Sequence, residues 1–115
     1  MAFRSDLNIP FSQLVSTASG GAEIALEEAL DQTQIGGLLQ NVVESHVTAD
    51  LSTGQSVQPV SVSFDIAGAL SGQAKLEFEP VIDRRTRTLV FANGIAKQAG
   101  RPILQATMVY RIVQS

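Results

Sequence analysis

The sequence predicts an α+β fold in which an antiparallel sheet wraps around one long helix. Residues 37–51 have the periodicity of an amphipathic helix, with apolar side chains three and four positions apart. Most of the chain after residue 59 instead alternates apolar and polar residues in segments that turn-forming residues separate. The expected order is a short helix, a strand, the long helix and then four strands, without an internal repeat.

The composition describes one globular domain spanning residues 1–115. Hydrophobic residues make up 44% of the chain and charged residues 17%, which is typical of a folded soluble protein. No apolar run approaches the ~18 residues of a membrane span, and the N-terminus lacks the pattern of a secretory signal. The absence of cysteine excludes disulfides and thiolate metal sites and fits a cytoplasmic protein. The net charge of −3 argues against a general nucleic-acid binder.

The first half of the chain contains the predicted helices. Residues 9–21 begin with a proline and end in a glycine pair, as a short helix would. Residues 22–27 alternate Ala22, Ile24 and Leu26 with glutamates, which indicates a strand. The long helix opens at the glycine pair Gly36–Gly37. Its apolar stripe consists of Leu38, Leu39, Val42, Val43, Val47 and Leu51.

The second half is predicted to be strands. Residues 52–59 are interpreted as a polar loop, and a turn is expected around Gly100. The first strand after the loop places apolar side chains on one face, and the second turns Leu76 and Phe78 inward against outward Lys75, Glu77 and Glu79. The face of the first strand consists of Val60, Val62, Phe64 and Ile66. Residues 88–96 and 103–113 form the last two strands.

One carboxylate in the long helix has two interpretations. On a helical projection the apolar side chains cover roughly 220°, with His46 near the middle of that arc. Glu44 falls just outside the arc, beside Gln40 and Asn41. It therefore belongs either to a solvated helix face or to a functional site.

A family resemblance favours the functional interpretation. The segment IGGLLQNVVES resembles the helix start of the phenylacetate-type acyl-CoA thioesterases, which have the hotdog fold. In that family an acidic residue follows the first glycine by eight positions, as Glu44 follows Gly36. The segment PVSVSFDI resembles the family's strand with a serine or threonine facing the site, here Ser61. GRPILQATMVYRIV resembles its last hairpin, so the resemblance covers roughly residues 10–113.

The sequence departs from the family pattern at two positions. The histidine before the glycine pair is Ile35 here, and the expected asparagine or glutamine falls on Ala29. Gln32 or Gln34 is a candidate replacement for that amide. A hydratase or dehydratase on the same fold needs a histidine–aspartate pair at the helix start, and Ile35 argues against it.

The chemistry explains why these residue types suit a thioesterase. Unpaired N–H groups and partial positive charge at a helix start stabilise an oxyanion, and glycine permits its close approach. Gly36 is the first candidate donor, and Gly37 is the second. Glu44 is predicted to attack the carbonyl or to activate a water. No metal or redox cofactor is required, and the substrate is a thioester of coenzyme A or of a carrier protein.

Three other groups of residues have both a structural and a functional interpretation. Arg84, Arg85 and Arg87 are either a solvated hairpin turn or a phosphate clamp for coenzyme A. His46 is better explained as a core histidine, because a serine nucleophile motif is absent. The acidic cluster is better explained as a solvated strand end than as a metal site. It consists of Glu27, Glu28 and Asp31.

The sequence thus predicts a thioester hydrolase with the hotdog fold. The alternative is a non-catalytic hotdog protein that binds an acyl-thioester or serves as a structural subunit. A homodimer or a dimer of dimers is expected, because pairing would cover the edge strand and the open helix face. Gly36 and Glu44 lie about 12 Å apart along one helix, so an active site that uses both is predicted to be shared between two chains.

Overall fold

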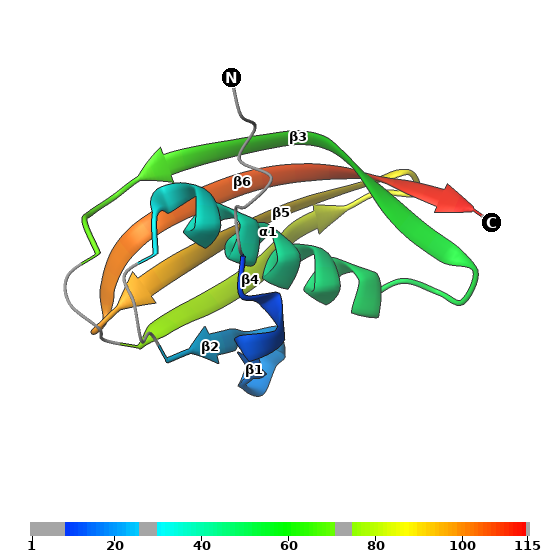
Figure 1. Ribbon diagram of the computed structural model, residues 1–115. Coiled ribbons are helices and arrows are strands. Elements are labelled where there is room, and N and C mark those ends of the chain that lie inside the picture. Colours follow the sequence, from blue (N-terminus) through cyan, green and yellow to red (C-terminus); the bar gives the residue numbers. More distant parts are fainter. Residues whose placement is uncertain (1–8, 26–29, 71–74, 115) are drawn as a thin grey trace, which may run out of the picture.

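One helix lies across one face of a six-stranded antiparallel sheet (Figure 1). The computed structural model describes residues 9–25, 30–70 and 75–114. The strand order is β1-β2-β4-β5-β6-β3, which confirms the predicted α+β class with a sheet around one long helix. The elements are β1 (Val15–Ser16), β2 (Ala22–Ile24), α1 (Gln32–Ala49), β3 (Gln55–Ile66), β4 (Leu76–Arg85), β5 (Leu89–Gln98) and β6 (Arg101–Gln114).

The long helix α1 begins five residues earlier than predicted. Asp31 caps it, because its side chain accepts a hydrogen bond from the Gln34 N–H while the Gln34 side chain accepts one from the Asp31 N–H. This reciprocal pair satisfies two of the four N–H groups that a helix start leaves unbonded. Gly36 and Gly37 therefore lie in the second turn of α1 and do not open it.

The predicted apolar stripe forms the contact between α1 and the sheet. Five of its six members are buried, namely Leu38, Leu39, Val42, Val43 and Val47, while Leu51 is half-buried beyond the helix end. They pack on the inward face of β5, which presents Val90, Ala92, Gly94 and Ala96. These small side chains let the helix backbone approach the sheet.

The N-terminal segment differs from the predicted short helix. Two 3₁₀ turns, Phe11–Gln13 and Ala18–Gly20, flank β1, which pairs with β2 at the edge of the sheet. No residue of the first turn is buried, so no burial of an apolar face stabilises a continuous amphipathic helix there. The following strand is confirmed over Ala22–Ile24, and residues 26–29 lie outside the described residues.

The strand β3 begins at Gln55, inside the predicted polar loop. It pairs with β6 along its length and forms one edge of the sheet, so most of its side chains stay exposed and its polar start resembles a loop in the sequence. A bulge between Pro59 and Ser61 shifts the register. The bulge removes Val60 from the apolar alternation that the sequence predicted.

The later strands follow the predicted pattern with one extension. Leu76 and Phe78 are buried while Glu77 and Glu79 are exposed, as expected. The strand β4 continues to Arg85, so two of the three clustered arginines lie in a strand and only Arg87 lies in the turn. The β5–β6 turn is confirmed at Gly100, where φ is +77°.

We expect Gly94→Ala to destabilise the fold by about 1–3 kcal/mol, because a methyl group there overpacks the interface between α1 and β5. An ideal Cβ on Gly94 would lie 2.6 Å from Val43 Cγ2 and 2.9 Å from Leu39 Cδ1. Urea unfolding followed by circular dichroism measures the change.

Gly36→Ala is the matched control for this prediction. Its Cβ would meet nothing closer than the Phe64 ring at 3.4 Å, and alanine favours a helix interior. Adding Val43→Ala to Gly94→Ala should give a loss smaller than the sum of the two single losses. Additive losses would show that the close contact is not the cause.

Candidate functional site

Two adjoining grooves run along the exposed flank of α1. The first, of about 600 Å³, contains Glu44 and is here called the Glu44 groove. The second, of about 510 Å³, contains Gly36 and is called the glycine groove. Gly37 and Gln40 line both, so the two grooves meet at the second and third turns of the helix. The remaining lining of the Glu44 groove is Phe11, Asn41, Ser45, Thr48 and Ala49.

The glycine groove is apolar on its sheet side. Phe64 and Ile66 of the edge strand β3 line it together with Leu104 of β6. Both β3 side chains are large and exposed, at 43% and 64%. Across the groove, Gly36 is buried, and a Cβ added there would lie 3.4 Å from the Phe64 ring. The glycine therefore leaves an apolar space between the helix and the edge strand β3.

The position of Gly36 within α1 decides whether its N–H is free to serve as the predicted oxyanion donor. As the fifth residue of α1, Gly36 gives its N–H to the carbonyl four residues earlier within the helix. The described residues offer no acceptor to the N–H groups of Gln32 and Thr33, which line the glycine groove. Among the described residues, the N–H groups of the helix start that have no acceptor thus lie about one turn before the glycine pair.

Glu44 lies at the margin between core and solvent. Its side chain is half-buried and lines its groove, so it is neither fully solvated nor part of the core. The neighbouring Tyr110 of β6 is fully buried. Burial raises the pKa of the Tyr110 phenol well above its usual value, and the negative charge of Glu44 raises it further.

Gly36 and Glu44 do not form one site within a chain. They lie eight residues apart on a continuous helix, about 12 Å along its axis, and they line different grooves. A single thioester carbon cannot lie within ~3–3.5 Å of both.

Ser61 lies on the opposite face of the sheet from α1. It pairs with Val109, whose neighbours Met108 and Tyr110 both point into the core beneath the helix. Directly paired residues share a face, so Ser61 points away from the helix. Val62 and Phe64 occupy the helix side of β3. Within one chain the structure thus separates Ser61 from both Gly36 and Glu44.

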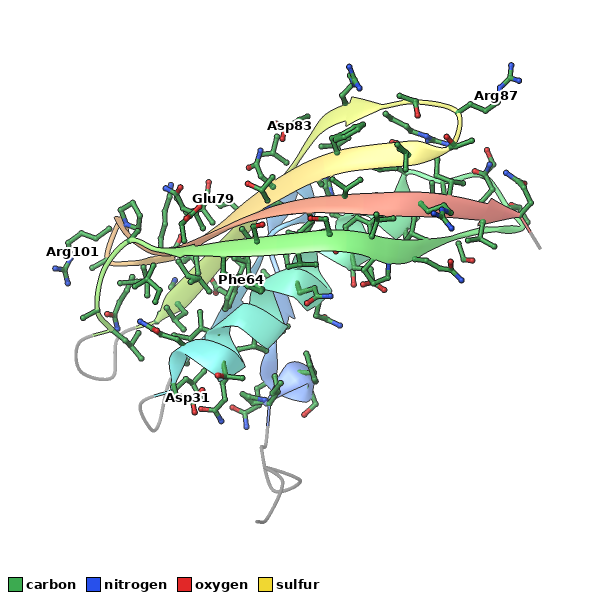
Figure 2. All side chains as sticks on the ribbon, turned by 90° about the horizontal axis from the view of Figure 1, so that it is seen from above. Asp31, Phe64, Glu79, Asp83, Arg87 and Arg101 are labelled. Carbon is green, nitrogen blue, oxygen red and sulfur yellow. The ribbon has the colours of Figure 1, made fainter. Side chains whose placement is uncertain are left out.

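The three clustered arginines point in different directions. Arg85 pairs with buried Val90 on the inner side of the sheet and forms an ion pair with Asp50, at 3.1 Å, just after α1. Arg84 pairs with Phe91 on the outer face, where its guanidinium lies 4.7 Å from the centre of the ring. Figure 2 shows Arg87 at the far end of the sheet from Asp31, where α1 begins.

The only histidine of the chain is half-buried beside the N-terminal segment. A Cβ on Gly20 would lie 2.1 Å from His46 Nδ1, so the ring fills the space that this glycine leaves. His46 thus has a packing role at the margin of the core rather than at its centre. Among the described residues, no three His, Asp or Glu side chains come together as metal ligands.

The structure adds residues that the sequence reasoning missed. Gln40 joins the two grooves, Thr48 lines the Glu44 groove one turn after the carboxylate, and Tyr110 lies buried on the helix-facing side of β6. The spacing of Gln40, Glu44 and Thr48, four residues apart, was visible in the sequence as a polar stripe. Tyr110 gave no such signal, because its position under α1 depends on the sheet register.

No helix of the described ranges is both long and apolar enough to cross a bilayer.

Solved structures share this fold at low sequence identity. A phenylacetic acid degradation-related protein from Ralstonia eutropha, provisionally named a thioesterase, is 21% identical, with a TM-score of 0.73 over 94% of each chain. The BH2602 protein from Bacillus halodurans, solved with CoA, is 14% identical, with a TM-score of 0.77 over 88% of this chain and 72% of that one. Thioesterase PA1618 from Pseudomonas aeruginosa, solved as a mutant, is 12% identical, with a TM-score of 0.76 over 89% and 81%.

These likenesses establish the hotdog fold of this chain, as the sequence resemblance predicted. No protein-family model and no curated protein matches the sequence. Because the identities are low, the activity has to be argued from the site residues.

We expect Arg85→Ala to lower the melting temperature, because it removes the contacts that join the end of α1 to the hairpin of β4 and β5. Both partners of the ion pair are partly exposed, so the loss should be about 1 kcal/mol or less and should shrink in high salt. Thermal unfolding at low and high salt measures it.

Arg87→Ala is the matched control, because the described residues provide Arg87 with no ion-pair partner. Its melting temperature should equal that of the unchanged protein. If all three arginines clamp a coenzyme A phosphate, each alanine variant should instead raise KM for coenzyme A esters by a similar factor. That result would contradict a purely structural role for Arg85.

Proposed function

We propose that this protein is an acyl-CoA thioesterase-like hydrolase that cleaves a thioester at a site formed between two chains. The main support is the half-buried carboxylate of Glu44 in an open groove, continuous with an apolar groove that Gly36 lines, on the fold of known thioesterases. A carboxylate beside apolar space suits a substrate with a reactive carbonyl and an apolar acyl group.

The residues divide the chemistry between the start of α1 and Glu44 in its second half. The partial positive charge and free N–H groups of the helix start favour the carbonyl oxygen as it becomes an oxyanion. Gly36 leaves room for the carbonyl to approach the backbone. Glu44 takes a proton from a water that attacks the carbonyl carbon, the carbon–sulfur bond breaks, and the proton passes from Glu44 to the departing thiolate. If Glu44 attacks the carbon itself, the thiolate leaves and takes a proton from water, and a second water then hydrolyses the mixed anhydride and regenerates the carboxylate.

A second copy of the chain would bring the helix start of one chain close to Glu44 of the other. The strand β3 is a twelve-residue edge with three exposed large side chains, namely Val60, Phe64 and Ile66. A long apolar edge is stable in water when another strand covers it. If two chains pair there with opposed helices, Glu44 of one chain faces Gly36 of the other. Ser61 remains on the outer face in this arrangement, and we leave it out of the proposed site.

The alternative is a hotdog protein that binds an acyl-thioester without cleaving it, or that serves as a structural subunit. One observation favours it. Ile35, at the position of the histidine in the resembling family, is 1% exposed and belongs to the core, so no polar group replaces that histidine.

The proposal also includes a substrate class and a compartment. The neighbour solved with CoA supports a coenzyme A thioester, and a carrier-protein thioester presents the same reactive group. Arg84 and Arg87 remain available for a phosphate, since Arg85 is engaged by Asp50. The cysteine-free composition fits the cytoplasm.

The first test is hydrolysis of a panel of acyl-CoAs by the protein and by Glu44→Gln. We expect thiol release from at least one ester and a kcat about 10²–10⁴-fold lower in the variant, because Glu44 supplies the base or the nucleophile. A thiol-reactive dye follows the reaction.

Glu77→Gln makes the same chemical change on the exposed outer side of β4 and should keep full activity. Tight acyl-CoA binding with no turnover on any ester would favour the non-catalytic alternative. Turnover that survives in Glu44→Gln would show that Glu44 belongs to a solvated helix face and has no catalytic role.

The second test is complementation between two inactive variants. Glu44→Ala lacks the carboxylate, and Gly36→Val fills the glycine groove against Phe64. A mixed dimer contains one site in which both residues are intact, so subunit exchange should restore up to about half of the activity per dimer, as expected for shared sites. Light scattering has to give a dimer or a tetramer, and native mass spectrometry has to detect the mixed species. Mixed dimers as inactive as their parents would refute the shared site.

A further inference from the structure

Ile9 lies at the junction of the two grooves. Its side chain lines the glycine groove, and Phe11, two residues later, lines the Glu44 groove. Its contact on the helix is Gly37, which lines both. An ideal Cβ on Gly37 would lie 2.7 Å from Ile9 Cδ1, so the end of the isoleucine side chain occupies the space that this glycine leaves. Ile9 therefore lies against the helix where the two grooves meet.

The backbone holds Ile9 against the helix. The proline at position 10 restricts the conformation of Ile9, and the Ile9 carbonyl accepts a hydrogen bond from the Phe11 N–H at 2.8 Å. In the 3₁₀ turn that follows, the Gln13 N–H donates to the Pro10 carbonyl at 3.1 Å. Leu14 after the turn is half-buried and packs on the core, as Ile9 does, before the chain reaches β1 (Figure 1). The segment is thus attached to the core on both sides of its turn.

Gly37 allows this contact. Glycine is among the least favourable residues in a helix interior, yet Gly37 lies in the second turn of α1. A side chain at this position would meet Ile9, whereas one at Gly36 would meet Phe64 of β3. The glycine pair thus receives the N-terminal segment on one side and the edge strand on the other.

The lining of the flank changes from apolar to polar at this point. In the glycine groove, Ile9 is joined by the apolar side chains of Phe64, Ile66 and Leu104. The α1 residues that line the Glu44 groove from Gln40 onward are mostly polar, namely Gln40, Asn41, Glu44, Ser45 and Thr48. Ile9 meets α1 at Gly37, five residues after Gln32 and about 7.5 Å further along the axis. An alkyl chain gains free energy only against apolar surface, so the groove suits a short chain that ends at Ile9.

We propose that Ile9 is a specificity-determining residue, which closes the glycine groove at Gly37 and restricts the substrate to thioesters of short acyl groups. This inference rests on the proposed function. In that function the acyl group lies in the apolar glycine groove, so a chain that extends along α1 past Gly37 meets the Ile9 side chain. Removal of the Ile9 carbons beyond Cβ should open this end of the groove to a longer chain.

The first experiment measures binding without any turnover. The thioethers butyl-CoA and octyl-CoA carry no carbonyl on the sulfur and cannot be hydrolysed as thioesters. We expect Ile9→Ala to raise the affinity for octyl-CoA relative to butyl-CoA by about tenfold, because each further methylene group that the groove encloses contributes about fourfold. Isothermal titration calorimetry measures both dissociation constants.

Two further variants show whether the space beside Gly37 is the cause. Adding Gly37→Ala to Ile9→Ala returns a methyl group to that space, so the affinity ratio should move back toward that of the unchanged protein. Val15→Ala shortens an exposed aliphatic side chain that lines neither groove, and it should leave the ratio unchanged. A ratio that Ile9→Ala does not raise, or that Gly37→Ala does not reverse, would overturn the proposal. Absence of binding by both thioethers would also overturn it.

The second experiment compares kcat/KM for butanoyl-CoA and octanoyl-CoA. The unchanged protein should favour butanoyl-CoA, and Ile9→Ala should raise the ratio of octanoyl-CoA to butanoyl-CoA by about tenfold or more. A side chain that only stabilises the fold would change both values by the same factor, so the ratio isolates the effect of chain length. Val15→Ala should keep the ratio of the unchanged protein.

Ile9→Val removes a single carbon and should move the ratio in the same direction by a smaller factor, so it provides the measurement if Ile9→Ala does not fold. Circular dichroism verifies the fold of each variant. An unchanged ratio in a folded Ile9 variant, or a preference of the unchanged protein for octanoyl-CoA, would contradict the specificity role.

The two experiments separate the two hypotheses. If no acyl-CoA is hydrolysed and the binding ratio still responds to Ile9→Ala, the proposed hydrolysis fails and Ile9 stands as the residue that limits chain length. If hydrolysis depends on Glu44 but neither ratio responds to Ile9→Ala, the proposed function stands and the role of Ile9 fails.

Discussion

The close approach of α1 to β5 is the contact on which the rest of the structure depends. The strand presents small residues beneath the helix, and Gly94 leaves room for Val43 and Leu39. Packing at this distance places the apolar stripe of α1 in the core and fixes the rotation of the helix about its axis. That rotation determines which flank remains open, and both grooves lie on this flank.

Because one flank of α1 is open, an amphipathic helix that packs on the sheet can still present a half-buried carboxylate to a groove. A fully solvated carboxylate would be surrounded by water, and a fully buried one would need a partner for its charge. Glu44 avoids both situations, since its half-buried side chain lies at the margin of the core and lines an open groove. In the function we propose, a second chain completes the site, and the edge strand β3 with its exposed apolar side chains offers that chain a surface.

The sheet separates residues that are neighbours in the sequence. Arg84 and Arg85 follow one another along β4, yet one stacks on Phe91 outside and the other binds Asp50 on the helix side. Ser61 and Val62 are divided between the two faces in the same way. Since successive strand residues point to opposite faces, a cluster in the sequence of a strand is rarely a cluster in space.

The sequence by itself determined the long helix, its apolar stripe, the last three strands and the spacing of Gly36 and Glu44. These follow from local periodicity, which each segment carries within its own residues. The cap of α1 at Asp31 is also local, because it joins residues three apart, although the apolar pattern alone placed the helix start five residues later. Only the tertiary structure decided that the polar segment from Gln55 is an edge strand, that Ser61 faces outward and that Tyr110 faces the helix side of the sheet. Each of these depends on a bulge or a strand register, which joins residues through hydrogen bonds that no single segment encodes.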